Sequence, residues 1–371
     1  MVIMAIDHVR DYFHYSAFFF DPNDPSQTTL PIFFTRFITN FCAPAFSFLA
    51  GLSAYMVGKR KSPAELSSFL IKRGLWLVFV EIILINFGWK FDIRFRSIGL
   101  ATIWQLGISM IVLAGLIHLP RTIILIFSCV IILGHNLLDQ IHFDGSFLWA
   151  ALHEPKFFEW TAGHFIRTAY PLVPWIAVMS LGYCFGSLYN SSFDPDRRKK
   201  ILNGLGFGSI ILFCILIGIN KYGDPSPWIN YGDFSKTFMS ILNSTKYPPS
   251  LLYLLMTLGG TFLFLGNSEK IKGKIVHFFC VFGRVPFFYY IIHIYLIHII
   301  AAFAAYFTGF GWQALVTPKF IIKVESLKGY GFNLITVYLI WMVIVLLLYP
   351  LCKKFDGYKQ SHKEKWWLSY L

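Results

Sequence analysis

The sequence predicts an all-α protein, a polytopic bundle of about ten transmembrane helices that forms a single domain over residues 1–371. Two observations carry this prediction. The apolar and aromatic residue types make up 56% of the chain and charged residues only 14%, whereas soluble domains carry about 25% charged residues. The apolar residues also gather into windows of roughly 17–25 residues, the length that crosses a bilayer. This composition excludes a soluble enzyme, a disordered chain and a disulfide scaffold.

Polar connections rich in Pro, Gly, Asn and Asp separate the windows. Pro120 and Arg121 break the chain between the fourth and fifth windows. The long connections 139–168, 220–247 and 308–332 are expected to be ordered caps with short interfacial helices. In order, the windows are 1–20, 37–57, 70–89, 97–117, 122–138, 169–189, 201–219, 248–266, 284–307 and 333–352.

Basic residues are distributed unevenly among the connections. The net charge is +13, and more than half of the 32 Lys and Arg residues lie in alternate connections and the C-terminal tail. Cytoplasmic loops collect Lys and Arg, so both termini are predicted to be cytoplasmic and the charge requires no nucleic-acid partner. The segment 90–96 is an exception, because it carries three basic residues on the predicted outer side. The predicted cytoplasmic segments are 58–73, 118–121, 194–200, 267–274 and 353–365.

The first window begins at Met1 with no polar segment before it. It lacks the basic region and the small-residue cleavage site of a signal peptide. We therefore expect a membrane helix whose abrupt start reflects a shortened chain or a misassigned start codon.

This first helix carries five ionisable residues in eight positions. At 100° per residue, Asp7, Arg10, Asp11 and His14 share a face about 100° wide, with His8 at its edge. Ionisable residues within membrane helices are costly and mark functional sites. We expect Asp7 and Asp11 to orient His8 or His14, one of which is then a general base. The alternative is an ion-pair network that only holds helices together.

Other polar residues in the windows carry weaker signals. His293 is expected to line the same cavity as this cluster, and His298 to be a hydrogen-bonded packing residue. Glu81 stands in the middle of the third window, where Arg73 or the first helix would be its partner. The six cysteines lie singly, mostly in apolar runs and without the spacing of a metal site, so no metal is expected.

Eight segments form an ordered set along the chain: "VIMAIDHVRDYFH", "FCAPAFSFLAGLSAYM", "FLIKRGLWLVFVE", "ATIWQLGISMI", "YPLVPWIAVMSLGY", "KYPPSLLYLLMTLG", "FGRVPFFYYIIHIYLIH" and "WWLSYL". In this order and spacing they resemble bacterial members of the heparan-α-glucosaminide N-acetyltransferase-like membrane proteins. The resemblance covers nearly the whole chain. It implies a transmembrane acetyltransferase that uses acetyl-CoA as its acyl donor.

The resemblance also suggests site residues. In the lysosomal relatives, cytosolic acetyl-CoA supplies acetyl to the amine of a terminal glucosamine across the membrane, and an asparagine and a histidine of the first family helix are the catalytic pair. Asp7 stands where that asparagine would be, and His8 or His14 stands for the histidine. His14 is slightly favoured, because it lies nearer the predicted outer face where the acceptor would arrive.

The leading hypothesis is therefore N- or O-acetylation of an amino sugar or another envelope glycan on the outer side of a bacterial cytoplasmic membrane. Membrane lipid and the acceptor are the expected partners, and a homodimer is one arrangement that the sequence permits. The residues expected to contact the acceptor are Arg10, Trp175, His293 and His164. The residues expected to bind the CoA phosphates are Lys72, Arg73, Arg121 and Arg284.

Three alternatives stand beside this hypothesis, one of which is a catalytically silent membrane scaffold. The four cations also fit the ordinary positive charge of cytoplasmic loops. The cluster from Asp7 to His14 would equally serve a proton-coupled transporter as a proton relay. Transporters commonly show internal repeats, and no repeat is visible in this sequence.

Overall fold

The computed structural model describes residues 1–317, 324–365 and 367–368. Most of them are helical, and the chain divides into two compact units. Unit 1 contains Met1–Cys42, Ile83–Ser97 and the described residues from Ile271 onward, and unit 2 contains Ala43–Ile82 and Ile98–Lys270. The single domain over 1–371 stays a prediction, and most of the closing "WWLSYL" segment lies outside the described residues.

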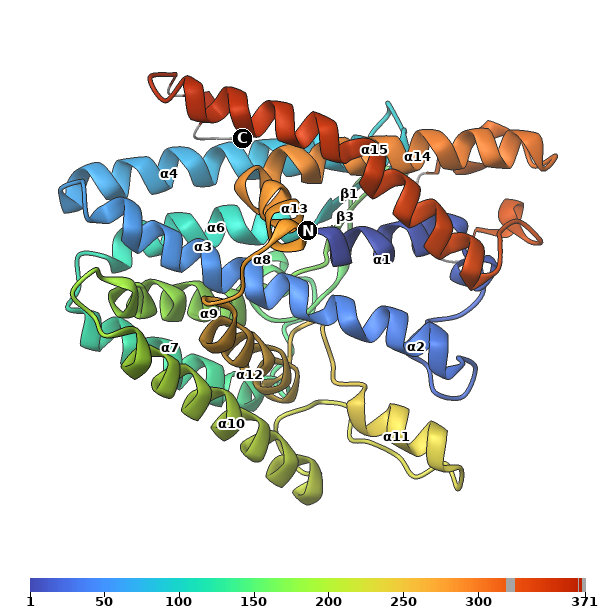
Figure 1. The fold of residues 1–371 in the computed structure, drawn as a ribbon. Coiled ribbons are helices and arrows are strands. Elements are labelled where there is room, and N and C mark those ends of the chain that lie inside the picture. The colour runs from blue at the N-terminus through green and yellow to red at the C-terminus, as the bar shows by residue number, and fades with distance from the viewer. Residues whose placement is uncertain (318–323, 366, 369–371) are drawn as a thin grey trace. The chain divides into compact units, whose positions relative to one another are not determined.

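Unit 1 is built around the N-terminal helix α1, which packs against α14 and α15 (Figure 1). Its core contains the apolar face of α1, formed by residues such as Ala5 and Val9, both fully buried. The helices of this unit are α1 (Val2–Phe13), α2 (Leu30–Phe37), α5 (Asn86–Lys90), α13 (Lys274–Arg284), α14 (Pro286–Phe307) and α15 (Leu334–Ser361). Short 3-10 turns follow or link them at η1 (Tyr15–Phe18), η2 (Ile38–Phe41), η6 (Trp312–Leu315) and η7 (Glu325–Leu327).

Unit 2 is a layered set of long helices that run side by side in Figure 1, with α4 on α6, α6 and α7 on α9, and α10 on α12. Its helices are α3 (Cys42–Gly58), α4 (Pro63–Val80), α6 (Thr102–Leu116), α7 (Arg121–Gly134), α8 (Phe147–Leu152), α9 (Leu172–Phe185), α10 (Pro195–Ile219), α11 (Phe234–Leu242) and α12 (Leu251–Ser268). The chain passes through one π-helical stretch, η3 (Glu81–Ile85), and through 3-10 turns at η4 (His135–Leu138) and η5 (Gly186–Tyr189).

Glycines allow one helix pair of unit 2, α3 and α9, to approach closely. A Cβ at Gly182 of α9 would collide with the Phe48 carbonyl of α3. On the facing side, a Cβ at Gly51 of α3 would collide with the Met179 carbonyl of α9. Small residues at helix contacts are the usual means of close packing in membranes, where lipid provides no hydrophobic drive for association.

Seven helices of the described residues are long and apolar enough to cross a membrane, and Thr102–Leu116 is a shorter apolar helix. The prediction of a helical membrane protein is therefore confirmed, while the count of ten spans stays a prediction. The window 1–20 forms a helix of only 12 residues, because the chain leaves the helix at His14 with φ −83° and ψ 128°. The window 70–89 lies within one continuous helical segment that runs from α4 through η3 into α5.

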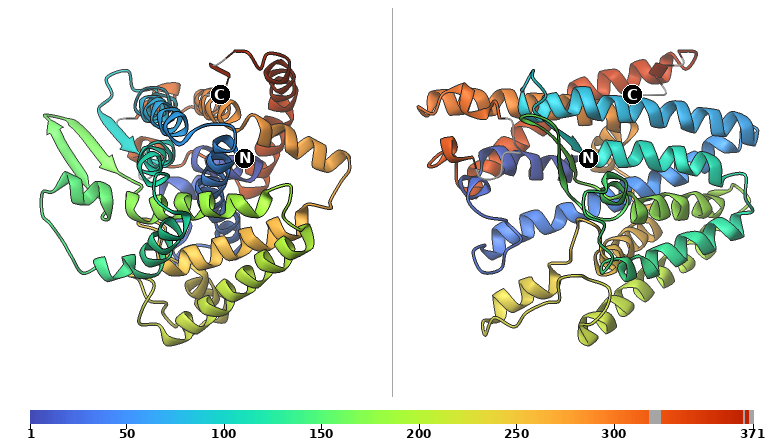
Figure 2. Two further views of the ribbon diagram at one scale, coloured as in Figure 1. Left: turned by 90° about the vertical axis from the view of Figure 1, so that its left-hand side faces the viewer. Right: turned by 180° about the vertical axis from the view of Figure 1, so that it is seen from behind.

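The connection 139–168 contains strands that the sequence analysis did not anticipate. β2 (Phe157–Thr161) pairs antiparallel with β3 (His164–Thr168), and β1 (Ser97–Leu100) completes a three-stranded sheet in the order β1-β3-β2. Gly163 turns the hairpin with φ +75°, a conformation that glycine adopts without a Cβ clash. Figure 2 shows the hairpin at the side of unit 2, where Phe158 of β2 packs against Phe147 of α8.

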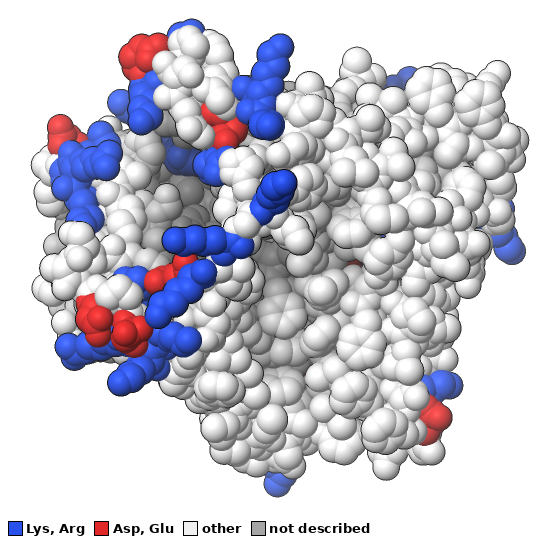
Figure 3. Space-filling model, in the orientation of Figure 1, with Lys and Arg blue, Asp and Glu red and all other residues white. Residues whose placement is uncertain are grey.

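The predicted cytoplasmic connections of unit 2 meet at one end of that unit. Ser67 of α4 donates to the Ala114 carbonyl of α6, and Arg198 of α10 forms an ion pair with Glu269 after α12. In Figure 3, Lys and Arg side chains gather over the ends of α3, α4 and α10. The positive charge that the sequence distributes among separate loops thus forms a patch in three dimensions.

Two of the three cations in the exceptional segment 90–96 have partners within the segment or next to it. Lys90 is buried and donates to the side-chain oxygen of Asn86 and to the Ser97 carbonyl. Arg96 pairs with Asp92 at 3.0 Å. Burial raises the pKa of Asp92, but hydrogen bonds from Arg96 and from backbone N–H groups outweigh it and hold that pKa below its usual value. Lys90 and Arg96 are thus engaged locally, whereas Arg94 is exposed.

Glu81 caps a helix. Its carboxylate, buried where α4 passes into the π-helical stretch, accepts hydrogen bonds from the backbone N–H groups of Ile103 and Trp104 at 2.8 and 3.2 Å. These N–H groups belong to the first turn of α6, whose own N-cap residue, Ala101, supplies no side-chain acceptor. A carboxylate at a helix N-terminus satisfies donors that no intrahelical carbonyl reaches and complements the helix dipole.

We predict that Glu81→Ala lowers the stability of the detergent-purified protein by about 1–3 kcal/mol, because two buried N–H donors of α6 lose their acceptor. Glu81→Gln keeps one side-chain acceptor oxygen and should lose less. Thermal unfolding followed by size-exclusion chromatography measures both. Equal melting temperatures for wild type and Glu81→Ala would contradict the capping role.

Candidate active site

The polar face of α1 is buried inside unit 1. Asp7 and Arg10 are buried, and His8 and Asp11 are partly buried. Charged side chains are rarely buried unless they are paired. The side chains that pair with these residues are therefore also part of the site.

Four charged side chains form a continuous ion-pair network. Arg10 bonds Asp7 at 3.0 Å and Asp11 at 2.6 Å, and Asp7 also pairs with Arg36 of α2. Two carboxylates and two guanidinium groups give no net charge. The structure thus brings together three of the residues that the sequence singled out and adds Arg36.

Sequence reasoning missed Arg36 because it lies 29 residues from Asp7, in a connection predicted to be extracellular. One signal was available. The stretch "LPIFFTRFITNF" holds a single cation among apolar residues, and a lone charge in such a setting requires a partner of opposite sign.

His8 contacts a second histidine from α14. Its Nδ1 lies 2.8 Å from Nε2 of His293, and the two rings are stacked with their planes 16° apart. His293 is fully buried, and its Nδ1 lies 2.9 Å from the Tyr289 carbonyl oxygen. Trp89 of α5 packs its edge on the His8 ring at 4.8 Å. His8 is therefore held in one orientation.

His14 has different surroundings. It stands just after α1, where its backbone neighbours pair with Phe332, and Gly331 is needed there because a Cβ would meet the Tyr15 backbone. The His14 ring is buried, and its Nδ1 accepts from the backbone N–H of Ser16 at 3.2 Å and lies 2.6 Å from the Ser16 hydroxyl. His14 thus caps the turn η1.

His298 is a packing residue, as predicted. It is buried, and its two ring nitrogens lie 2.8 Å from the Gly88 carbonyl and 3.1 Å from the Leu315 carbonyl. Phe91 stacks on the ring at 3.8 Å. These contacts tie α14 to α5 and η6 within unit 1.

Two expected acceptor-binding residues belong to unit 2. Trp175 of α9 is fully buried, and its Nε1 has no hydrogen-bond partner among the described residues. His164 opens strand β3, is partly exposed, and has its Nδ1 3.2 Å from the Ala162 carbonyl. Trp175 is therefore a fully buried packing residue with an unpartnered N–H among the described residues, whereas His164 is a hairpin residue beside Trp160.

The expected CoA-binding cations have unequal surroundings. Arg284 is engaged, because it pairs with the buried Asp356 at 2.7 Å within unit 1. In unit 2, Arg121 lies over the Tyr55 ring and Arg73 over the Phe69 ring. Lys72 is exposed.

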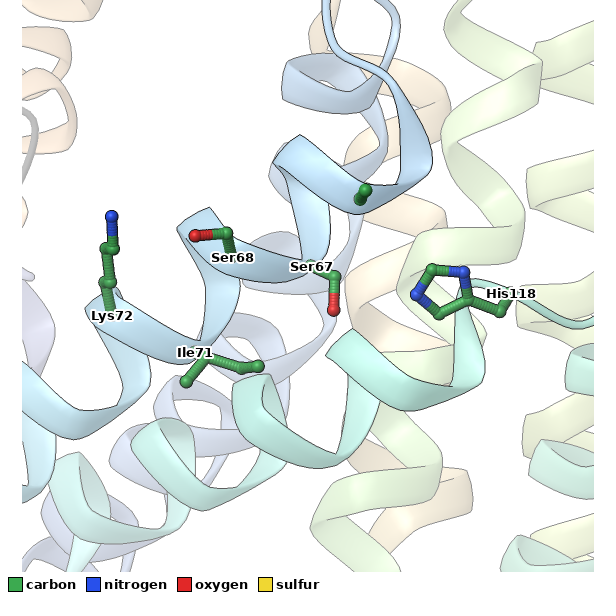
Figure 4. A pocket seen from close by; sticks show the side chains of 6 residues that line it. Ser67, Ser68, Ile71, Lys72 and His118 are labelled. Atoms are coloured by element: carbon green, nitrogen blue, oxygen red, sulfur yellow. The ribbon is translucent and has the colours of Figure 1, made fainter.

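Lys72 lines a pocket of about 410 Å³ between α4 and the end of α6. Figure 4 shows Lys72, His118 and two serines around it. A lysine, a histidine and hydroxyl donors are side chains that bind phosphate oxygens. The lining residues are Ala64, Ser67, Ser68, Ile71, Lys72 and His118. Among the described residues, no three His, Cys, Asp or Glu side chains are grouped to hold a metal ion.

Long apolar helices, a buried ion-pair network and a histidine pair define a helical membrane protein with a candidate acid–base site. A family model agrees in more detail: the model described as heparan-alpha-glucosaminide N-acetyltransferase, catalytic, matches residues 1–213. This match covers more than half of the chain, so the protein belongs to that family of membrane acetyltransferases. It gives the transporter alternative no support. No curated protein and no solved structure matches the chain.

We predict that Arg36→Ala destabilises the protein by about 3–5 kcal/mol, because it leaves the buried network with a net negative charge. The double variant Arg36→Ala, Asp7→Asn restores neutrality and should recover part of this loss. Thermal unfolding in detergent compares the three proteins. A double variant less stable than Arg36→Ala would contradict a network governed by charge balance.

Proposed function

We propose that this protein transfers the acetyl group of acetyl-CoA from the cytoplasmic side of a bacterial inner membrane to an amino sugar of an envelope glycan on the outer side. Membership of the acetyltransferase family supports the reaction class. The basic loops at one end of unit 2 support a cytoplasmic donor, since those loops are the ones expected inside.

His8 is the proposed general base. The observation that carries this assignment is the 2.8 Å contact between His8 Nδ1 and His293, which orients one ring nitrogen and leaves the base function to the other. His8 also lies within the matched residues and next to the neutral ion-pair network. His14 is the weaker candidate, because its Nδ1 accepts the Ser16 N–H and a neutral ring then carries its proton on Nε2.

In the proposed step, His8 removes a proton from the acceptor amine as the nitrogen attacks the thioester carbonyl. The carbon–sulfur bond breaks with its electron pair on sulfur, so CoA leaves as a thiolate, and the proton held by His8 returns to sulfur or to water. Positioning of donor and acceptor contributes a large part of the rate in such transfers.

For the donor, we propose that Lys72, with Arg73 and Arg121, binds the CoA phosphates. The pocket beside Lys72, which His118 and Ser68 also line, supports this assignment. The Ser67 hydroxyl is already engaged, because it donates to the Ala114 carbonyl. Arg284 is a poorer candidate, because its pairing with Asp356 already neutralises it.

We predict that His8→Gln lowers acetyl transfer from radiolabelled acetyl-CoA to mixed amino-sugar acceptors on the order of 10²–10⁴-fold, the usual contribution of acid–base catalysis. Gln keeps hydrogen bonding and similar bulk but takes up no proton near neutral pH. His14→Gln is the matched control and should lose much less. The opposite ranking would move the base to His14, and full transfer by the double variant would exclude both.

We predict that Lys72→Ala weakens CoA binding roughly 10–100-fold, the effect of losing one charge-assisted hydrogen bond of about 1.5–3 kcal/mol. Lys61→Ala is the control, because it removes an equal charge from the same end of unit 2 without touching the pocket. Calorimetric titration of CoA measures both. Equal losses of CoA affinity in the two variants would mean that these cations act only through the overall positive charge of the loops.

A further inference from the structure

The hydrogen bonds of His293 determine which of its ring nitrogens carries the proton. Its Nδ1 lies 2.9 Å from the Tyr289 carbonyl oxygen, four residues earlier in α14. A carbonyl oxygen only accepts hydrogen bonds, so Nδ1 must be the N–H donor. A neutral imidazole has one N–H group. Nε2 of His293 is therefore an acceptor.

This acceptor in turn determines the tautomer of His8. Nε2 of His293 lies 2.8 Å from Nδ1 of His8, so His8 must donate from Nδ1. In its neutral form His8 then has its lone pair on Nε2. The reverse polarity would require a doubly protonated His293, and a charge on a fully buried ring carries a large desolvation penalty.

Aromatic packing holds both rings in this geometry. Tyr289 stacks on His293 with ring planes 1° apart, and Tyr290 meets the same ring edge-on. Trp89 meets His8 edge-on from α5. The imidazole rings are thus fixed on several sides, so the direction of the hydrogen bond from His8 to His293 is built into the packing of α1, α5 and α14.

We propose that His293 is a positioning residue that selects the tautomer of His8 and makes Nε2 of His8 the atom that receives the acceptor's proton. This proposal rests on the proposed function for the catalytic step, while the tautomer itself rests on geometry alone. When Nε2 takes up the proton, Nδ1–H keeps its bond to His293, so the polarity of the Tyr289–His293–His8 chain need not reverse during the reaction. An imidazole relay of this kind plays the part that a carboxylate plays in many acid–base pairs.

The tautomer can be measured without assaying activity. Solid-state nuclear magnetic resonance on protein with isotope-labelled histidine, reconstituted in lipid bilayers, distinguishes protonated from unprotonated ring nitrogens. The chain has 11 histidines, and the His8 signals are identified by their absence from the His8→Gln spectrum. We expect His8 with Nδ1 protonated and Nε2 unprotonated. A wild-type His8 protonated on Nε2 would overturn the proposal.

Two substitutions at His293 test its consequence for catalysis. His293→Gln keeps an acceptor oxygen near the position of Nε2, whereas His293→Leu keeps bulk and removes the acceptor. We expect His293→Leu to lower kcat at least 10-fold with an unchanged KM for acetyl-CoA and to shift the His8 proton to Nε2. His293→Gln should keep the His8 tautomer and most of kcat.

The outcomes separate this proposal from the proposed function. An unchanged His8 tautomer in a folded His293→Leu protein would refute the positioning role. If His293→Gln lost as much kcat as His293→Leu and also moved the His8 proton to Nε2, the acceptor at Nε2 of His293 would not be the cause. The proposal would then be refuted as well. If the tautomers behaved as expected while His8→Gln transferred acetyl normally, the proposed base would be wrong and the tautomer assignment would stand.

Discussion

The need to neutralise buried charge governs unit 1. Asp7 and Arg10 are buried on α1, and no apolar surroundings would tolerate either residue alone. The chain from Arg36 through Asp7 and Arg10 to Asp11 satisfies this need with two charges of each sign. It also ties α2 to α1. The charged residues of α1 are costly to bury, and the pairing that neutralises them also forms a contact between α1 and α2.

Polar groups elsewhere follow the same rule, and each one connects separate parts of its unit. In unit 2, the Glu81 carboxylate at the end of α4 accepts a hydrogen bond from a backbone N–H group in the first turn of α6. His298 joins α14 to α5 and η6 through backbone carbonyls in unit 1. In an apolar interior these groups find no water, so protein partners must replace it. The polar residues thereby specify which apolar helices pack together.

The two candidate histidines show how tertiary contacts give similar residues different surroundings. His8 and His14 are both near the polar face of the first helix, and the predicted topology slightly favours His14, which lies nearer the outer face. Their contacts differ, because His14 accepts the backbone N–H of Ser16 whereas Nδ1 of His8 lies 2.8 Å from Nε2 of the buried His293. A capping histidine has its acceptor nitrogen engaged, and a histidine that donates from Nδ1 has its lone pair on Nε2.

The sequence by itself determined the membrane class, the positions of most helices, the polar face of α1 and the family resemblance. These depend on composition, on apolar run length and on residues close together along the chain. The tertiary structure decided the partners. Arg36 lies 29 residues from Asp7 and His293 lies 285 residues from His8, and the β2–β3 hairpin arises in a connection without a clear alternating pattern. Helical periodicity describes which side of a helix is polar, but only the packing of distant segments determines which group meets it.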